Sequence, residues 1–106
     1  METENIVVFI TASTEDEAAA IAQTVVGEGL AGCVNIVRGV RSIYRWQGKV
    51  EDEQEVLMVV KTGRHRFDAL SRRVKELHRY TVPEIIALPV VEGSEEYLNW
   101  LKEVTG

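Results

Sequence analysis

The segment from Cys33 to Trp46 constrains this chain most, because its composition predicts one long strand rich in valine, isoleucine, tyrosine and tryptophan. Gln47-Gly48 is a two-residue turn that returns the chain into a second strand from Lys49, since glycine accepts the positive φ of such turns. At roughly 3.3 Å per residue the first strand extends about 46 Å, whereas a domain of this size has a radius of gyration near ~13 Å. The far part of this hairpin, called the ribbon below, must therefore project or fold over.

The ribbon has apolar side chains that need a cover, namely Ile43, Tyr44 and Trp46. A lone two-stranded ribbon is marginally stable in water. Two explanations remain open: the ribbon bends back onto its own domain, or a neighbouring subunit covers it. We favour the second, because closed rotational symmetry also pairs exposed sheet edges, and we predict these three residues at an oligomer interface.

The remaining pattern predicts a single α+β domain over residues 1–106. Apolar runs predict strands at residues 6–10, 33–46, 49–61 and 85–91, and apolar residues at helical spacing predict helices near residues 14–27, 67–77 and 94–104. Two βαβ units joined by a hairpin give a ferredoxin-like βαββαβ antiparallel sheet with an extended hairpin and a C-terminal helix. Gly39 predicts a bulge in the second strand, and Pro89 predicts that the fourth strand lies at a sheet edge.

Charge and cysteine content exclude several functions. The chain has 17 acidic and 12 basic side chains, which argues against a nucleic-acid partner. The one cysteine, Cys33, forms no intrachain disulfide and gives no support for secretion. The acidic N-terminus lacks the pattern of a signal peptide, and no segment reaches the ~20 apolar residues of a membrane span. We therefore expect a cytoplasmic protein.

Few residues are candidates for chemistry. Cys33 is interpreted as a buried structural thiol, because no base is placed beside it by the local sequence. A metal site formed by His78, Cys33 and Glu84 requires groups from another subunit, and the position of His78 at a helix end also has a purely structural explanation. Lys61, Tyr80 and Glu84 are polar groups adjoining apolar runs, which predicts either a surface salt bridge or a ligand cleft.

Several segments resemble the CutA family of divalent-cation tolerance proteins. The resemblance spans almost the whole chain in the same order, and it rests on residues 33–36, 42–49, 57–62, 80–89 and 97–100. It implies a cytoplasmic, ferredoxin-like homotrimer that is structurally related to the PII signalling trimers and is associated with tolerance of copper. It implies no enzymatic reaction. The family's copper ligands fall at Ile10, Leu77 and His78, and Arg79 replaces a proline of the family motif, so of that set only His78 is a possible ligand here.

Two functions follow as hypotheses. The first is a homotrimer that binds or signals divalent metal ions, with copper as the possible cofactor. The alternative is a PII-like sensor that binds a small anionic metabolite in clefts between subunits, with Lys61 and arginines of the ribbon as its basic groups. No glycine-rich phosphate loop supports the alternative.

Overall fold

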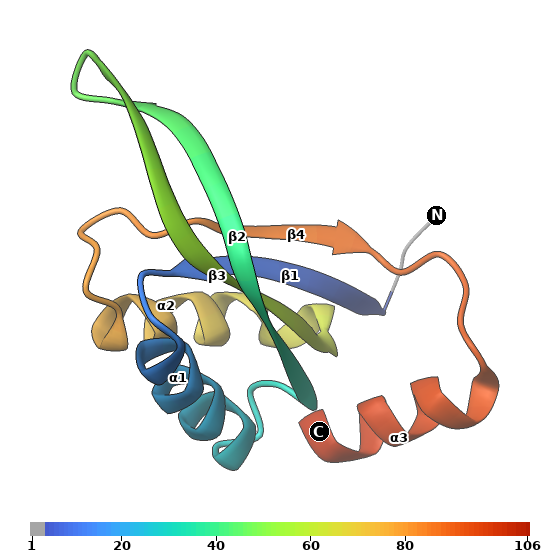
Figure 1. Ribbon diagram of the computed structural model, residues 1–106. Helices are drawn as coiled ribbons and strands as arrows, with labels where there is room; N and C mark the ends of the chain where they lie inside the picture. The colour runs from blue at the N-terminus through green and yellow to red at the C-terminus, as the bar shows by residue number, and fades with distance from the viewer. Residues whose placement is uncertain (1–3) are drawn as a thin grey trace.

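The computed structural model describes residues 4–106 and has a four-stranded antiparallel sheet with three α-helices (Figure 1). The sheet order is β2-β3-β1-β4, so the ferredoxin-like prediction is confirmed. In chain order the elements are β1 (Asn5–Ala12), α1 (Glu15–Gly27), β2 (Cys33–Trp46), β3 (Lys49–Gly63), a short 3-10 turn (Arg64–Arg66), α2 (Phe67–Leu77), β4 (Ile85–Pro89) and α3 (Glu95–Thr105).

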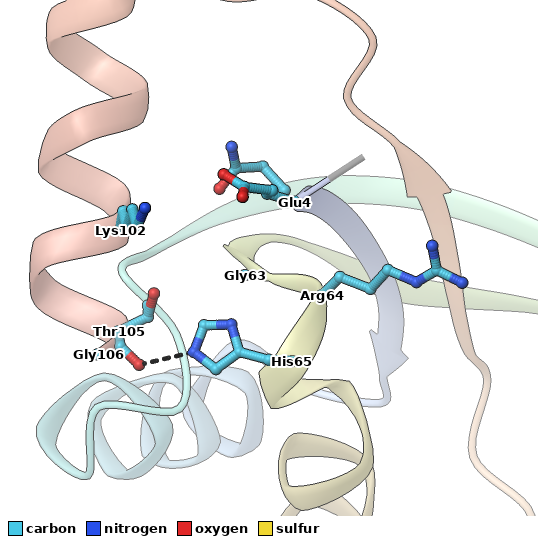
Figure 2. Close-up of a pocket in the computed structure, with 8 residues that line it drawn as sticks. Glu4, Gly63, Arg64, His65, Lys102, Thr105 and Gly106 are labelled. Atoms are coloured by element: carbon cyan, nitrogen blue, oxygen red, sulfur yellow. Dashed lines mark hydrogen bonds between the residues drawn. The ribbon is translucent and has the colours of Figure 1, made fainter. Parts of the chain in front are cut away.

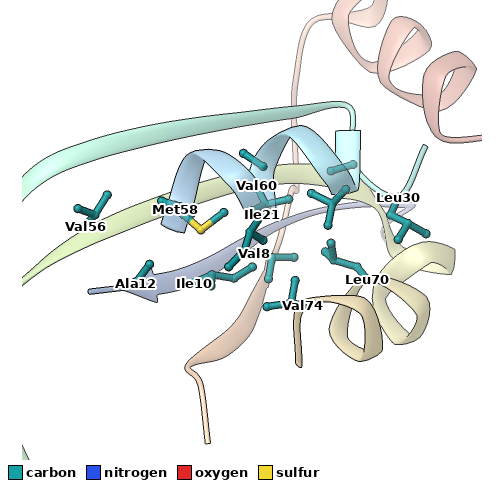
Figure 3. Close-up of a cluster of buried hydrophobic side chains, with 14 of the residues drawn as sticks. Val8, Ile10, Ala12, Ile21, Leu30, Val56, Met58, Val60, Leu70 and Val74 are labelled. Carbon is teal, nitrogen blue, oxygen red and sulfur yellow. The ribbon is translucent and has the colours of Figure 1, made fainter. Parts of the chain in front are cut away.

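The core lies between the sheet and helices α1 and α2 (Figure 3). Alternate residues of the two central strands point into it and are fully buried, among them Val8, Ile10, Met58 and Val60. The helices contribute apolar side chains at helical spacing, including Ile21, Leu70 and Val74. Strand alternation and helix periodicity therefore meet in one apolar layer.

Polar side chains fix where two of the helices begin. The Thr14 hydroxyl accepts the backbone N–H of Glu17 at 3.1 Å, and Ser94 accepts that of Tyr97 at 3.3 Å. Each bond satisfies an N–H group that the first helical turn leaves free. Helix α3 then packs at the end of the sheet, where Leu101 and Thr105 are buried beside Gly32 and Gly63.

The ribbon projects from the body of the molecule and does not fold back on it (Figure 1). The molecule measures 43 Å along its longest axis but 28 and 23 Å across. At the tip, Gln47 and Gly48 have φ angles of 50° and 79°, as the predicted turn requires. Ile43 and Val50 stay about two-thirds exposed. The first of the two explanations for the ribbon is therefore wrong.

A bulge interrupts the pairing of β2 with β3, as Gly39 predicted. Val37 pairs with Leu57 and Val40 with Glu55, so two residues of β2 lie opposite one of β3. Gly39 has a φ of 76°, which residues with a side chain adopt at a cost of roughly 1–2 kcal/mol. Successive residues of a strand alternate between the two faces of the sheet, and the extra residue of the bulge shifts this alternation by one. Beyond the bulge, even-numbered residues of β2 such as Tyr44 therefore lie on the face that odd-numbered residues such as Val37 occupy before it.

The sheet face opposite α1 and α2 is apolar and partly exposed. We call it the open face. Val37, Ile86 and Leu88 are 45%, 54% and 50% exposed there. Directly opposed residues of an antiparallel pair share a face, so the open face comprises Val7, Phe9, Val37, Leu57, Val59, Ile86 and Leu88.

Truncation of Leu70 tests the importance of the core layer. Leu70→Ala keeps a good helix former but leaves a cavity under the sheet, and we expect the free energy of unfolding to fall by about 2–5 kcal/mol. Urea denaturation at one protein concentration measures the change. Val91→Ala, at a site 70% exposed, is the control and should change stability by less than about 0.5 kcal/mol. Equal losses in the two variants would contradict this assignment of the core.

Candidate functional site

A groove of about 740 Å³ runs along the ribbon, beside the loop that joins α2 to β4. The loop and the ribbon approach one another on the same side of the molecule (Figure 1). The lining residues come from three parts of the chain: Thr11 of β1; Ser42, Ile43, Tyr44, Trp46, Glu51, Glu53 and Glu55 of the ribbon; and Arg79, Tyr80, Thr81, Val82 and Glu84 of the loop.

The ribbon wall of the groove combines aromatic rings with carboxylates. Tyr44 pairs with Glu51 and Ser42 with Glu53, so these side chains share one face. The bulge at Gly39 creates this combination, because it brings the even-numbered residues of distal β2 onto the face of the odd-numbered glutamates of β3. Tyr44 and Trp46 remain 37% and 44% exposed on this wall.

Tyr80 closes the inner end of the groove. Its hydroxyl donates to a carboxylate oxygen of Glu55 at 2.8 Å. Glu55 is only 7% exposed, so this bond satisfies a carboxylate that burial would otherwise penalise. Burial, followed by the hydrogen bond and charge of Glu55, raises the pKa of Tyr80 well above its ordinary value. Tyr80 is thus a neutral donor at physiological pH.

His78 anchors the loop from behind the groove. Its side chain is fully buried, and Nε2 lies 2.7 Å from the carbonyl oxygen of Thr11. The backbone N–H of Tyr80 donates to Nδ1 at 3.0 Å, so the proton of the neutral ring belongs on Nε2. Both ring nitrogens are therefore occupied by hydrogen bonds in the single chain.

Glu17 ties the start of α1 to the same loop. Its carboxylate accepts the hydroxyl and N–H of Ser13 and, at 2.9 Å, the N–H of Arg79; it also lies 3.6 Å from His78 Nδ1. Burial alone raises the pKa of Glu17, but these hydrogen bonds and the neighbouring His78 outweigh it, so the pKa lies below its ordinary value. An ionised Glu17 thus stabilises the loop that forms one wall of the groove.

The groove has the charge of a cation site. Four glutamates line it against one guanidinium, that of Arg79. Desolvation raises the pKa of Tyr44, and the negative charges of Glu53, Glu55 and Glu51 raise it further. The direction of this shift agrees with a negative electrostatic potential in the groove. Within residues 4–106, no three His, Cys, Asp or Glu side chains converge as a ready-made metal site. The charge of the groove therefore favours cations over anions, although the described residues form no metal cage.

The predicted site residues separate into two groups. Tyr80 and Glu84 line the groove, as do the predicted interface residues Ile43, Tyr44 and Trp46. Lys61 and Cys33 instead pair with each other at the far end of the sheet, where Lys61 donates to Asn35. One chain therefore brings neither Lys61 nor Cys33 to the groove. Cys33 is only partly buried, so the prediction of a buried thiol is wrong.

A second hollow, of about 570 Å³, lies at the C-terminal end of α3 (Figure 2). His65 Nε2 lies 3.3 Å from the carbonyl oxygen of Thr105, and Arg66 donates to the same oxygen at 2.6 Å. Arg64 extends away from His65. Side chains that donate hydrogen bonds at a helix C-terminus satisfy its free carbonyl groups. The hollow is therefore the place where the end of α3 packs on the rest of the domain.

Comparison with known proteins identifies the family. The family model described as CutA1 divalent ion tolerance protein matches residues 6–104. The chain belongs to the CutA1 family. It is 59% identical to the divalent-cation tolerance protein CutA of Thermus thermophilus over 100 residues, which cover 94% of this chain and 97% of the relative. A solved structure of the divalent cation tolerance protein Cut A1 from Thermus thermophilus superimposes with a TM-score of 0.94 at 58% identity, covering 96% of this chain and 99% of the other.

More distant CutA relatives are also similar. The Arabidopsis thaliana protein named CutA, chloroplastic, is 44% identical over 95% of this chain, which spans 56% of that relative. The resemblance noted from the sequence is thereby confirmed, and this chain belongs to a family of divalent-cation tolerance proteins. In residues 4–106, no helix combines the length and the apolar content that crossing a membrane demands.

Two residues at the family's copper positions pack in or against the core, and the residue that replaces the motif proline lines the groove. Ile10 is fully buried in the core, Leu77 packs partly buried against it, and Arg79 lines the groove. The polar residues of the site that the sequence did not single out are Glu17 and the glutamates at 51, 53 and 55. For the latter the signal was present, since Glu51, Glu53 and Glu55 are alternate residues of β3 and therefore share one face of the strand.

Neutralisation of Glu17 tests the anchoring of the loop. A carboxyl whose pKa is lowered on folding stabilises the fold above its ordinary pKa of 4.5, and this contribution disappears as the pH falls through the folded pKa. We expect Glu17→Gln to lower the free energy of unfolding by about 1–3 kcal/mol at pH 7, and the difference from the original chain to shrink below pH 4.5. Urea denaturation across pH measures both effects. Glu92→Gln, at an exposed position, should show neither.

Proposed function

We propose that this chain acts as a cytoplasmic homotrimer in tolerance of divalent metal ions, copper among them, and that it binds or signals these ions without catalysing a reaction. The observation that carries the proposal is the groove, in which four glutamates face one arginine. Such a site concentrates cations. The single free cysteine, Cys33, supports a reducing compartment and hence the cytoplasm.

The same charge balance weighs against a sensor of anionic metabolites. An anion in the groove would meet three net negative charges, four from the glutamates less one from Arg79. Lys61, the basic group expected to bind such a ligand, lies beside Cys33 in the same chain and not beside Tyr80. The alternative therefore requires a second subunit to bring its basic groups into the groove.

Copper imposes a further requirement on the site. Cu²⁺ is bound well by imidazole nitrogens, and carboxylate oxygens alone suit harder ions such as Mg²⁺. His78 lies directly behind Tyr80, with ring centroids 4.7 Å apart. It could act as a copper ligand beside Glu84 only by giving up its bond to Thr11 or the bond it receives from Tyr80. Copper binding would therefore loosen the loop, which offers a route from binding to a signal.

Calorimetric titration with Cu²⁺ tests metal binding. We expect binding to the original chain, weakened about tenfold or more in Glu84→Gln, because that change removes one charge from the groove. His78→Ala should weaken copper binding and leave Mg²⁺ binding nearly unchanged. Glu92→Gln, at an exposed position outside the groove, is the control and should bind like the original chain. The metal proposal fails if no variant binds copper or if all of them bind it equally.

The open face supports assembly into an oligomer. Val37 of β2 and Ile86 and Leu88 of β4 lie on the two edge strands, and the open-face residues of the central strands lie between them. Large exposed apolar patches mark interaction sites, and unpaired sheet edges favour pairing with another chain. Tyr44 and Trp46 extend this surface along the ribbon, and Ile43 is exposed on the other face of the ribbon; a neighbouring subunit would cover all three.

Charge substitutions on these surfaces test the trimer. We expect the original chain to sediment at three times its mass of 11.9 kDa. Leu88→Glu, and separately a Tyr44→Glu and Trp46→Glu double variant, should shift sedimentation toward the monomer, because each would bury unpaired charge between subunits. Glu92→Gln is the control for the assembly. An unchanged trimer in the ribbon variant would show that the ribbon does not join the subunits.

A further inference from the structure

Glu55 lies at the inner end of the groove, where the sheet narrows into the ribbon. It is the first residue of β3 beyond the end of β1, since Val56 is the last residue of β3 that pairs with that strand. Its side chain is more than nine-tenths buried in the single chain. This burial therefore does not depend on whether a neighbouring subunit covers Tyr44 and Trp46.

The two carboxylate oxygens of Glu55 differ in their contacts. Oε2 accepts the Tyr80 hydroxyl at 2.8 Å, and this is the hydrogen bond of the carboxylate among residues 4–106. Among the same residues, no side-chain nitrogen or oxygen is both sealed from solvent and without a hydrogen-bond partner. Oε1 therefore opens to the groove that Glu55 lines. A buried carboxylate with one open oxygen has the chemistry of a ligand for a divalent cation.

Tyr80 holds two candidate metal ligands at once. Its hydroxyl binds the carboxylate of Glu55, and its backbone N–H donates to Nδ1 of His78 at 3.0 Å. The tyrosine ring also packs on the imidazole, with 4.7 Å between the ring centroids. Carboxylates bind divalent ions through one oxygen or through both. An ion that binds both oxygens of Glu55 takes the place of the Tyr80 hydroxyl proton.

We propose that Glu55 binds a divalent metal ion through both of its oxygens, and that the Tyr80 hydroxyl competes with the ion for this carboxylate. The inference rests on the proposed function, because it takes the groove as the place where divalent ions bind. It adds a ligand that the sequence did not single out and a residue that sets the affinity of the site. Metal binding frees the Tyr80 side chain from the ribbon, so one hydrogen bond couples the ion to the loop.

Titration calorimetry of the full chain with Mn²⁺, an ion that suits carboxylate oxygens, tests the competition. Tyr80→Phe removes the hydroxyl and keeps the ring and the backbone bond to His78. We expect this variant to bind Mn²⁺ about tenfold more tightly than the original chain, because binding no longer breaks a hydrogen bond to a charged group. Tyr97→Phe, which removes a tyrosine hydroxyl outside the groove, is the matched control and should leave the affinity unchanged.

A second substitution locates the effect at Glu55. Glu55→Gln should weaken Mn²⁺ binding about tenfold or more, and adding Tyr80→Phe to it should have no further effect. Sedimentation checks that each variant assembles like the original chain; if Glu55→Gln does not, Tyr80→Phe alone decides. Unchanged or weaker binding in Tyr80→Phe would overturn the proposal, as would an equal gain in the presence and absence of the Glu55 carboxylate. A damaged fold would lower the affinity, so it does not imitate the expected gain.

Titration of the same variants with Cu²⁺ separates this proposal from the proposed function. Metal binding by the original chain with no gain in Tyr80→Phe would remove the competition and leave metal binding by the groove in place. Tighter Mn²⁺ binding in Tyr80→Phe without any binding of Cu²⁺ would support the competition and remove copper. Failure of both the original chain and Tyr80→Phe to bind either ion would remove the two proposals together.

Discussion

The antiparallel pairing of β2 with β3 is the interaction on which the rest of the molecule depends. Near Cys33 the pair belongs to the sheet and borders the core, and beyond Gly39 the same pair continues alone into solvent. The backbone groups that face each other across the ribbon are thus paired, but its outer edges have no partner strand and its side chains have no second layer to pack on. The exposed apolar residues, the groove and the expected contacts between subunits all follow from a pair of strands that is longer than its domain.

Much of the architecture could be predicted from local sequence. The backbone preferences of a few neighbouring residues determine three of its features: the limits of β2, the turn at Gln47 and Gly48, and the edge position of Pro89. Strand order follows from the chirality of the crossovers, which does not depend on particular contacts. The family resemblance was also visible, because its motifs lie at turns and strand ends.

The site was less predictable, because it depends on contacts between distant parts of the chain. Glu17 and His78 meet where α1 begins and α2 ends, a contact that no local pattern indicates. Lys61 and Tyr80 each adjoin an apolar strand, but those strand ends lie at opposite ends of the sheet: Lys61 is level with Val7, whereas β4 begins level with Ile10. Periodicity shows which face a residue occupies, but not which end of a sheet it reaches.

The bulge at Gly39 selects one of two surfaces that the same residues could form. With regular pairing through this point, Ile43 would lie opposite Glu51 and Arg41 opposite Glu53, and the arginine would neutralise the row of carboxylates. One unpaired residue instead turns the aromatic rings toward the glutamates and sends Arg41 to the other face, where it binds Asp52. An insertion of a single residue thereby decides both the sign of the electrostatic potential and the polarity of a surface several residues away. Chains of similar composition that differ in this bulge would therefore share a fold and present different surfaces along the ribbon.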